Sequence, residues 1–195
     1  MNELTRLGLE VQKFCEARKW QFCFIGGVAV QHWSEPRYTQ DVDLTLFTGF
    51  GNEPAYIDEL LRHFRPRVQD PEIFFLQTRV ALLYSKRGIG INIALGAFSY
   101  EQEAVQRSTK IELEKGAKLR LCTAEDLIIM IIMKSFAARP IDWHDVRGVL
   151  VRQGTKNLDW PYIHRHLTVL AELKEEPEIV TQLQSLHAEV AGSEP

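Results

Sequence analysis

Ile25-Gly26-Gly27 and Asp41-Val42-Asp43-Leu44, separated by residues 28–40, form the stretch of sequence that decides the fold. In an extended strand, residues i and i+2 point to the same face, so Asp41 and Asp43 are expected to project together. The two apolar residues that alternate with them point to the opposite face, which predicts that this face is buried. Neighbouring carboxylates repel each other unless a cation lies between them, and their hard oxygen atoms suit Mg²⁺. The pattern therefore predicts a metal-binding acidic pair on one strand.

The glycine pair follows the apolar run Phe22–Ile25 and precedes a helix-like run, Val28–Trp33. A strand–Gly-Gly–helix junction lets the backbone approach a phosphate closely and directs free helix N–H groups at it. Taken alone, Gly26-Gly27 is better explained as a tight turn without a ligand. Together with the aspartates, it favours chemistry on a nucleoside triphosphate.

The complete pattern, Gly-Gly-x13-Asp-x-Asp with apolar flanks, resembles the signature of the DNA-polymerase-β-type nucleotidyltransferase superfamily. The resemblance covers roughly residues 20 to 160, and it is closest to the bacterial branch of minimal nucleotidyltransferases and abortive-infection (AbiEii-like) toxins. Three further pieces carry it: Arg37-x-Thr39-x-Asp41, Leu95-Gly96 followed by Glu101, and Ala124–Ile128 before Lys134.

This resemblance implies an α/β (α+β) fold. A mixed β-sheet nucleotidyltransferase core flanked by helices is expected in residues 1–121. A C-terminal helical half, packed on the core, is expected in residues 122–195. The local patterns place strands at 73–76 and 80–84, paired with each other, and helices at 55–64, 124–137, 142–152, 159–172 and 177–190.

The resemblance also implies an Mg²⁺-dependent (or Mn²⁺-dependent) enzyme that moves a nucleoside monophosphate from a triphosphate to an acceptor hydroxyl or phosphate. Asp41 and Asp43 would hold the metal. The predicted catalytic residues are Asp41, Asp43, Asn92 and Lys134. The predicted nucleotide-binding residues are Gly26, Gly27, Arg37, Thr39, Lys134 and Asp142. Two alternatives stay open: Lys134 could simply pair with Asp142 or Asp145, and the residues before the acidic strand could only fix the loop.

Asn92 is a departure from the family pattern. It lies in an apolar strand, Ile89–Gly96, where a third carboxylate is expected to act as a metal ligand or general base. Asparagine has nearly the same shape but cannot usefully accept a proton. The chain is then naturally impaired, or it carries an introduced change, or another carboxylate serves. We prefer an Asp→Asn change, natural or introduced, on an otherwise intact frame.

Composition and charge limit the classes of protein that this sequence can encode. The chain of 195 residues is 45% hydrophobic and 25% charged, with a net charge of −3, which argues against tight nonspecific nucleic-acid binding. The longest apolar run, Leu127–Met133, is too short to span a bilayer, and the N-terminus resembles no signal peptide, so a cytoplasmic protein with no membrane partner is predicted. Cys15, Cys23 and Cys122 have no paired spacing and are expected to be buried free thiols.

The expected partners are a nucleoside triphosphate and an acceptor, which could be an RNA such as tRNA, a protein or a small molecule. A cognate antitoxin is a further expected partner. The competing interpretation is a non-catalytic nucleotide-binding or interaction module of a toxin–antitoxin or defence pair. Asn92 favours that interpretation, whereas the retention of both aspartates argues against it.

Overall fold

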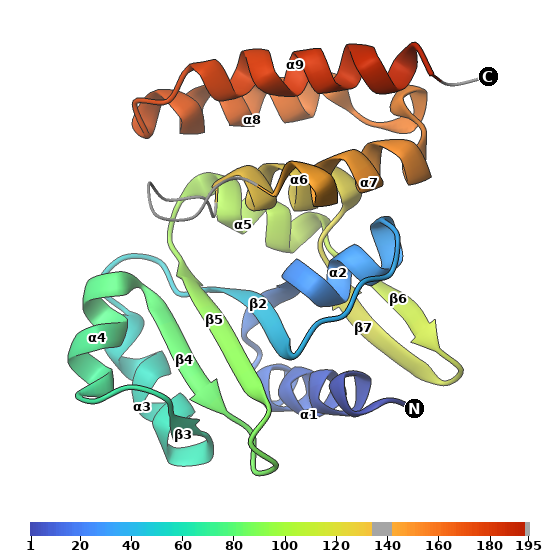
Figure 1. Cartoon of the computed structure of the whole chain (residues 1–195). Helices are drawn as coiled ribbons and strands as arrows, with labels where there is room; N and C mark the ends of the chain where they lie inside the picture. The colour runs from blue at the N-terminus through green and yellow to red at the C-terminus, as the bar shows by residue number, and fades with distance from the viewer. Residues whose placement is uncertain (134–141, 194–195) are drawn as a thin grey trace. The chain divides into compact units, whose positions relative to one another are not determined.

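The structure is a computed structural model that describes residues 1–133 and 142–193 (Figure 1). The chain divides into two compact units. The first comprises Met1–Val28 and Tyr38–Cys122, and the second comprises Ala29–Arg37 and Thr123–Pro195. Residues 134–141, including the predicted site residue Lys134, lie outside the described residues.

The first unit is built on a seven-stranded mixed sheet in the order β3-β4-β5-β2-β1-β7-β6 (Figure 1). The central strand β2 pairs antiparallel with β1 and parallel with β5. The predicted mixed sheet is therefore confirmed. The strands are β1 (Gln21–Ile25), β2 (Asp41–Phe47), β3 (Arg65–Pro66), β4 (Val80–Tyr84), β5 (Gly90–Gly96), β6 (Thr109–Glu114) and β7 (Ala117–Leu121).

Alternation along β2 separates a core face from a polar face. Val42, Leu44 and Leu46 are completely buried in the main hydrophobic cluster, as the apolar alternation predicted. The same cluster includes apolar residues of α1 and α3. Four helices and the start of a fifth belong to this unit: α1 (Glu3–Ala17), α3 (Glu53–His63), α4 (Pro71–Thr78), α5 (Ser99–Arg107) and the first residues of α2 (Gly26–Trp33).

A side chain of α1 replaces a missing strand partner. Gln12 donates through Nε2 to the carbonyl of Lys118 at 3.0 Å, and its Oε1 accepts from the backbone N–H of Arg120 at 2.8 Å. Strand β7 pairs with β1 only through Leu121 and Phe24, so these peptide groups have no neighbour there. Buried backbone groups require partners, and Gln12 supplies them.

The predicted strand at 73–76 is wrong, because these residues lie in helix α4. Pro71 occupies the first turn, where its fixed φ and missing N–H suit a helix. Phe75 is fully buried while Ile73 and Leu76 are exposed, which is a one-sided helical pattern. A short apolar run cannot by itself distinguish the two structures, and here the proline decides. Strand β4 pairs instead with β3 and β5.

The second unit is helical. Helix α6 contacts α7 and α8, and α9 contacts α7 and α8. The predicted helices at 142–152, 159–172 and 177–190 are confirmed, and the one predicted at 124–137 is described as far as Met133. No helix in the described residues is long and apolar enough to cross a membrane. The helices are α6 (Ala124–Met133), α7 (Trp143–Gln153), α8 (Trp160–Leu173) and α9 (Glu178–Ala191), with a 3-10 turn η1 (Thr155–Asn157).

A buried carboxylate links two helices of this unit. Asp126 is 0% exposed, and it accepts hydrogen bonds from Tyr162 Oη at 2.7 Å and from Thr123 Oγ1 at 2.8 Å. The Thr123 hydroxyl also accepts from the Asp126 backbone N–H at 3.2 Å and so caps the start of α6. The Tyr162–Asp126 bond therefore ties α8 to the start of α6.

Tyr162→Phe is expected to lower the free energy of unfolding by about 2 kcal/mol, because a buried acceptor loses its donor. Urea unfolding monitored by circular dichroism measures the change. Tyr38→Phe is the control, since Tyr38 is 81% exposed and should leave stability unchanged. Equal stability of the Tyr162→Phe variant and the wild type would contradict the structural role of this bond.

Candidate functional site

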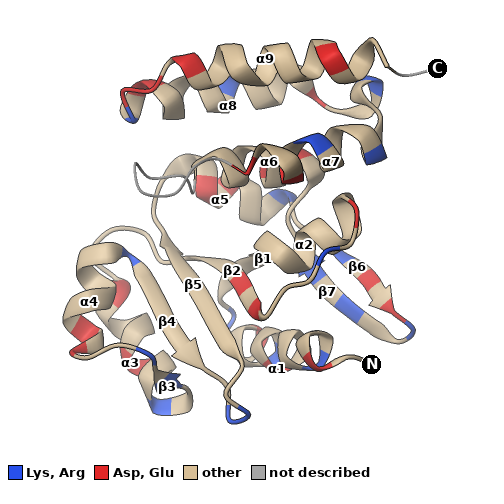
Figure 2. Cartoon of the chain, in the orientation of Figure 1, with Lys and Arg blue, Asp and Glu red and all other residues tan. Residues whose placement is uncertain are grey.

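Asp41 and Asp43 lie on the polar face of β2, with Asn92 of the neighbouring strand beside them. The register pairs Asp41 with Gly90 and Asp43 with Asn92. On the other side of β2, Ile25 pairs with Asp43, so the Gly26-Gly27 turn that follows β1 begins next to this carboxylate. Acidic residues at the start of β2 are visible in Figure 2. The structure thus brings together the acidic pair, the glycine turn and Asn92 within the first unit.

The Asn92 amide bridges the two carboxylates. Its Nδ2 donates to Asp43 Oδ1 at 3.0 Å and to Asp41 Oδ2 at 3.3 Å. The orientation of the amide is determined by Arg67, whose Nη1 donates to Asn92 Oδ1 at 2.8 Å. Two N–H groups therefore point at the carboxylates, where an aspartate at position 92 would add a third negative charge.

Glycines make room for both aspartates. A Cβ at Gly26 would lie 2.8 Å from Asp43 Cγ, and a Cβ at Gly90 would lie 2.7 Å from Asp41 Cγ. Gly26 also has a φ of +57°, a conformation that side chains disfavour. A Cβ at Gly27 would lie 2.6 Å from Thr39 Cβ, so Thr39 packs against the turn. No residue larger than glycine fits any of these three positions without displacing a neighbour.

The acidic pair fits a divalent cation. Mg²⁺ is commonly bound through one or two carboxylates together with substrate phosphates, and Asp41 and Asp43 provide such a pair on one face. Across residues 1–133 and 142–193, no group of three or more His, Cys, Asp or Glu side chains is arranged to hold a metal. Asp41 and Asp43 are thus the residues that would hold Mg²⁺, with the substrate supplying further oxygen ligands.

Arg67 and Tyr84 are site residues that the sequence did not predict. Arg67 Nη1 lies 3.7 Å from Asp41 Oδ2, and its guanidinium carbon lies 5.4 Å from the centre of the Tyr84 ring. A Cβ at Gly90 would lie 2.9 Å from the same nitrogen, so Arg67 occupies the space above Gly90. Its side chain is 27% exposed, and its charge partly offsets the two carboxylates.

The predicted residues Arg37 and Asp142 lie in the second unit, and both have partners there. Arg37 forms a bidentate ion pair with Asp145, with Nε–Oδ1 at 2.7 Å and Nη2–Oδ2 at 2.6 Å. The Asp145 side chain is 5% exposed. Asp142 caps helix α7 by accepting from the Asp145 backbone N–H at 3.2 Å. Asp145, one of the two partners considered for Lys134, is thus engaged by Arg37.

Thr39 bonds to the backbone of β2, and the cysteines are buried. Thr39 Oγ1 donates to the Asp41 carbonyl at 3.4 Å, which holds the segment before β2. All three cysteines are buried, and none forms a disulfide, as predicted. Burial raises the pKa of the Cys15 thiol to about 12, so this side chain is a packing residue rather than a nucleophile.

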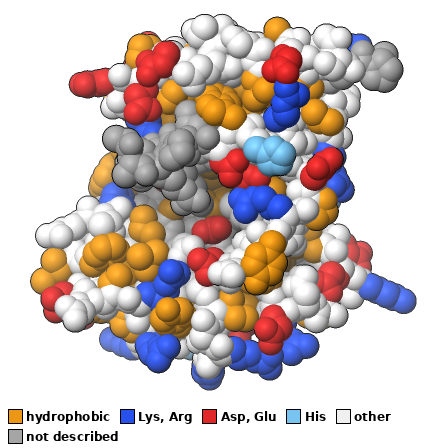
Figure 3. Space-filling model, in the orientation of Figure 1, with side chains coloured by type: hydrophobic (Ala, Val, Ile, Leu, Met, Phe, Trp, Pro, Cys, Tyr) orange, Lys and Arg blue, Asp and Glu red, His pale blue; other side chains and the backbone are white. Residues whose placement is uncertain are grey.

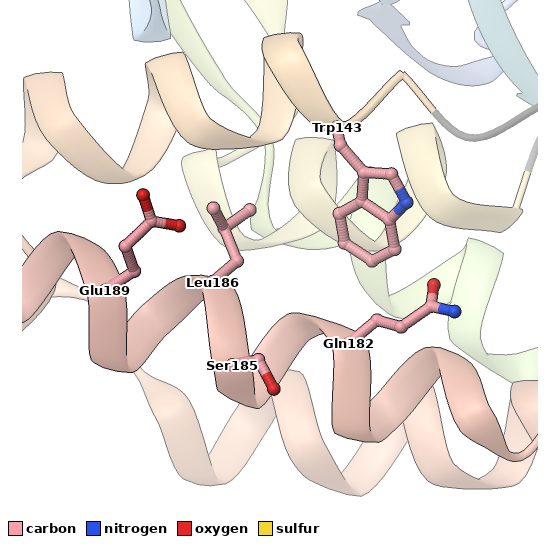
Figure 4. A pocket seen from close by; sticks show the side chains of 5 residues that line it. All are labelled: Trp143, Gln182, Ser185, Leu186 and Glu189. Atoms are coloured by element: carbon pink, nitrogen blue, oxygen red, sulfur yellow. The ribbon is translucent and has the colours of Figure 1, made fainter.

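A pocket of about 340 Å³ lies within the second unit, between Trp143 at the start of α7 and α9 (Figure 4). Its other lining residues are Gln182, Ser185, Leu186 and Glu189. Among the described residues, none of those predicted to carry the chemistry lines this pocket, and Glu189 is paired with Arg147.

Comparison with known proteins supports the fold. No protein-family model matches the chain, and no curated protein matches it. The chain is similar to the crystal structure of ANT(2'')-Ia in complex with adenylyl-2''-tobramycin, with a TM-score of 0.53 and 12% identity over 88% of this chain and 98% of that chain. The solution structure of the antibiotic-resistance factor ANT(2'')-Ia gives a TM-score of 0.52 and 16% identity over 94% and 97%.

A third similar structure is an antigenic nucleotidyltransferase-like protein from Paracoccidioides brasiliensis. It has a TM-score of 0.50 and 20% identity, over 95% of this chain and 92% of that chain. At these identities the likeness concerns the fold. The chain has the α/β fold of nucleotidyltransferases, as the resemblance of its motif implied.

Proposed function

We propose that the chain is a nucleotidyltransferase that moves a nucleoside monophosphate from a nucleoside triphosphate to an acceptor hydroxyl or phosphate. The observation that carries this proposal is the convergence of Asp41 and Asp43 on one face of β2, beside a strand–Gly-Gly–helix turn. The glycines that exclude a Cβ next to each carboxylate support it further. A strand with a purely structural role would not require glycines on its neighbours to leave room for its carboxylates.

Each residue has a role in this proposal. The first N–H groups of α2, at the Gly26-Gly27 turn, bind the β- and γ-phosphates, because the first turn of a helix leaves them without acceptors in the helix. Asp41 and Asp43 hold Mg²⁺ or Mn²⁺, which when bound neutralises charge on the phosphate oxygens. Lys134, outside the described residues, and Asp142 remain proposed contributors to triphosphate binding, with Arg37 and Thr39 positioning the segment before β2.

The reaction is an in-line displacement. An oxygen of the acceptor forms a bond to the α-phosphorus while the bond to the bridging oxygen of pyrophosphate breaks. A hydroxyl acceptor must also lose its proton, and Asn92 cannot accept it. We therefore propose that this chain binds nucleotide and turns it over slowly. The acceptor classes open to such an enzyme include RNA, proteins and small molecules of the kind bound by ANT(2'')-Ia.

A second candidate function is a nucleotide-binding or interaction module without catalysis, in a toxin–antitoxin or defence pair. One observation favours it: the Asn92 amide donates to both carboxylates, so they are satisfied by protein groups alone. Metal dependence separates the two candidates. The enzyme requires a divalent cation for tight triphosphate binding, whereas the module does not.

Calorimetric titration with ATP, GTP, CTP and UTP, each with and without Mg²⁺, tests the proposal. We expect Mg²⁺-dependent binding of at least one triphosphate, and a loss of about tenfold or more in affinity for Asp43→Asn. Asp58→Asn is the matched control, because it makes the same change on the exposed face of α3. Triphosphate binding that does not depend on Mg²⁺ would favour the second candidate. Absence of binding would exclude the enzyme and leave only an interaction module that binds no nucleotide.

A further inference from the structure

The first unit has a pocket of its own, at the β3–β4 edge of the sheet. It has a volume of about 270 Å³ and is lined by His63, Arg65, Tyr84, Ser85, Lys86 and Gly88. It is formed by the end of α3, by β3 and by the turn between β4 and β5. Figure 2 shows Lys and Arg at β3 and at this turn, and Figure 3 shows basic side chains gathered over the same region.

The strand register connects this pocket to the site. Asp41 pairs with Gly90, Gly90 with Tyr84, and Tyr84 with Arg65, so one row of residues crosses four strands. Since neighbouring strands are about 4.8 Å apart, Tyr84 lies roughly 10 Å from Asp41 along the row. Gly90 contributes no side chain between them, and Arg67 fills part of this gap.

The pocket is cationic. Arg65 and Lys86 are exposed, and neither forms an ion pair with a carboxylate in the part of the chain that the structure describes. The Arg65 guanidinium carbon lies 5.0 Å from the centre of the Tyr84 ring, which holds it at the wall of the pocket. Arg67 approaches the same ring from the acidic pair. Three positive side chains therefore extend from Asp41 to the pocket.

The in-line geometry of the proposed displacement indicates which of the two substrates lies near Arg65, Arg67 and Lys86. The Gly26-Gly27 turn follows β1, on one side of β2, whereas β5, β4 and β3 lie on the other side. If the pyrophosphate leaves toward the glycine turn, the attacking oxygen must approach from the opposite side, across Asn92 and Gly90. The acceptor then meets Arg67, Tyr84 and the cationic pocket.

We propose that this pocket binds a phosphate group of the acceptor, so that the acceptor is a sugar hydroxyl compound that also carries phosphate. This inference rests on the proposed nucleotidyl transfer. A phosphate is matched by Arg65 and Lys86, which bind phosphate oxygens as a fork and as a point charge. A polycationic acceptor would be repelled by the same groups. The terminal ribose of an RNA strand and a free sugar phosphate both have the required chemistry.

The test measures binding to the whole chain of 195 residues without triphosphate or divalent metal, so that it does not depend on catalysis. The probe is a fluorescein-labelled single-stranded RNA of six nucleotides, followed by fluorescence anisotropy at several NaCl concentrations. Ribose 5-phosphate and inorganic phosphate serve as competitors. Arg65→Glu and Lys86→Glu are each expected to weaken RNA binding about tenfold. Each should also reduce the slope of log affinity against log NaCl concentration by about one, because one ionic contact is lost.

Arg87→Glu is the matched control for Lys86→Glu. Arg87 is in the same turn but does not line the pocket, and it lies 3.5 Å from Glu3. Its reversal changes the net charge by the same amount and is expected to weaken binding less than about threefold, because only long-range attraction is lost. Equal losses for the two variants would overturn the proposal, since they would indicate a diffuse electrostatic effect.

The competitors distinguish the two sources of phosphate. Displacement of RNA by ribose 5-phosphate, more strongly than by inorganic phosphate, supports a free sugar phosphate; RNA binding that resists both supports an RNA end. Tobramycin, a polycation, is titrated directly by calorimetry and is expected to give no binding heat. Mg²⁺-dependent triphosphate binding without any binding of the phosphate probes would overturn this inference and leave the proposed function intact. Probe binding that is lost in Lys86→Glu, without triphosphate binding, would overturn the proposed function and leave the phosphate pocket.

Discussion

Asn92→Asp is expected to raise the rate of nucleotidyl transfer at least tenfold, toward the roughly 10²–10⁴-fold that a general base contributes. The amide nitrogen of Asn92 lies 3.0 Å from Asp43 Oδ1 and 3.3 Å from Asp41 Oδ2, so a carboxylate oxygen at this position would join the acidic pair directly. It could then accept the proton of the attacking hydroxyl. Release of pyrophosphate, measured with the preferred triphosphate and candidate acceptors, gives the rate.

The same variant has a second readout that does not require an acceptor. Three converging carboxylates repel each other, and Arg67 alone cannot offset them, so the variant should be less stable than the wild type without metal. A ligand that binds only the folded state stabilises it, and Mg²⁺ should therefore raise Tm more in the variant than in the wild type. Asn2→Asp is the matched control. It adds the same charge at the N-cap of α1, where aspartate is also a favoured cap, and should leave the response of Tm to Mg²⁺ unchanged.

Asn92 would be excluded as the catalytic position by one clear result. If Asn92→Asp keeps Mg²⁺-dependent triphosphate binding but gains no activity with any acceptor that the wild type uses, another group carries the proton. If instead the variant loses triphosphate binding, the amide itself holds Asp41 and Asp43 in place, as the second candidate function requires.

Gly90→Ala is expected to reduce Mg²⁺-dependent nucleotide binding about tenfold or more, because the added Cβ displaces one of the two carboxylates that would hold the metal. The new Cβ would lie 2.7 Å from Asp41 Cγ and 2.9 Å from Arg67 Nη1. Both atoms belong to flexible side chains, so they can move away while the strand stays paired. The fold should therefore remain, with Tm within a few degrees of the wild type. Calorimetry and thermal unfolding measure the two quantities.

Gly116→Ala is the control, and it is expected to lower stability without changing nucleotide binding. Gly116 has a φ of +79° in the turn between β6 and β7, and nothing lies within 4 Å of an added Cβ. Alanine there should cost about 1 kcal/mol of stability through backbone strain and leave nucleotide binding unchanged. If Gly90→Ala also loses stability while it retains nucleotide binding, the space above Gly90 does not serve the site.

The central part of the site could be predicted from the sequence because its pattern is local. Strand β2 contains the predicted acidic strand with its two aspartates on one face, since alternation of aspartate and apolar residues allows one buried face. The glycine turn follows directly from its position between a strand and a helix. Asn92 was also placed correctly on a strand, because its apolar flanks identify a buried strand.

Other parts of the site depend on pairing between distant residues. Arg67 reaches Asn92 only because β3 pairs with β4 and β4 with β5, and no local pattern encodes this register. Gly90 contributes by the space above it, which becomes apparent once Asp41 is known to be its neighbour. Likewise, Arg37 pairs with Asp145, which is 108 positions away, so no local pattern favours this partner over a phosphate.

The glycines beside the carboxylates have a consequence for mutagenesis. An alanine scan deletes side chains and reports the groups that make contacts, so it would find Asp41, Asp43 and Arg67 and pass over the residues that leave room for them. At Gly26, Gly27 and Gly90 the informative experiment is the reverse, in which a methyl group is added and the lost function reports the volume that must stay empty. The empty volume at these glycines is part of the site, and substitutions that add a methyl group are needed to detect it.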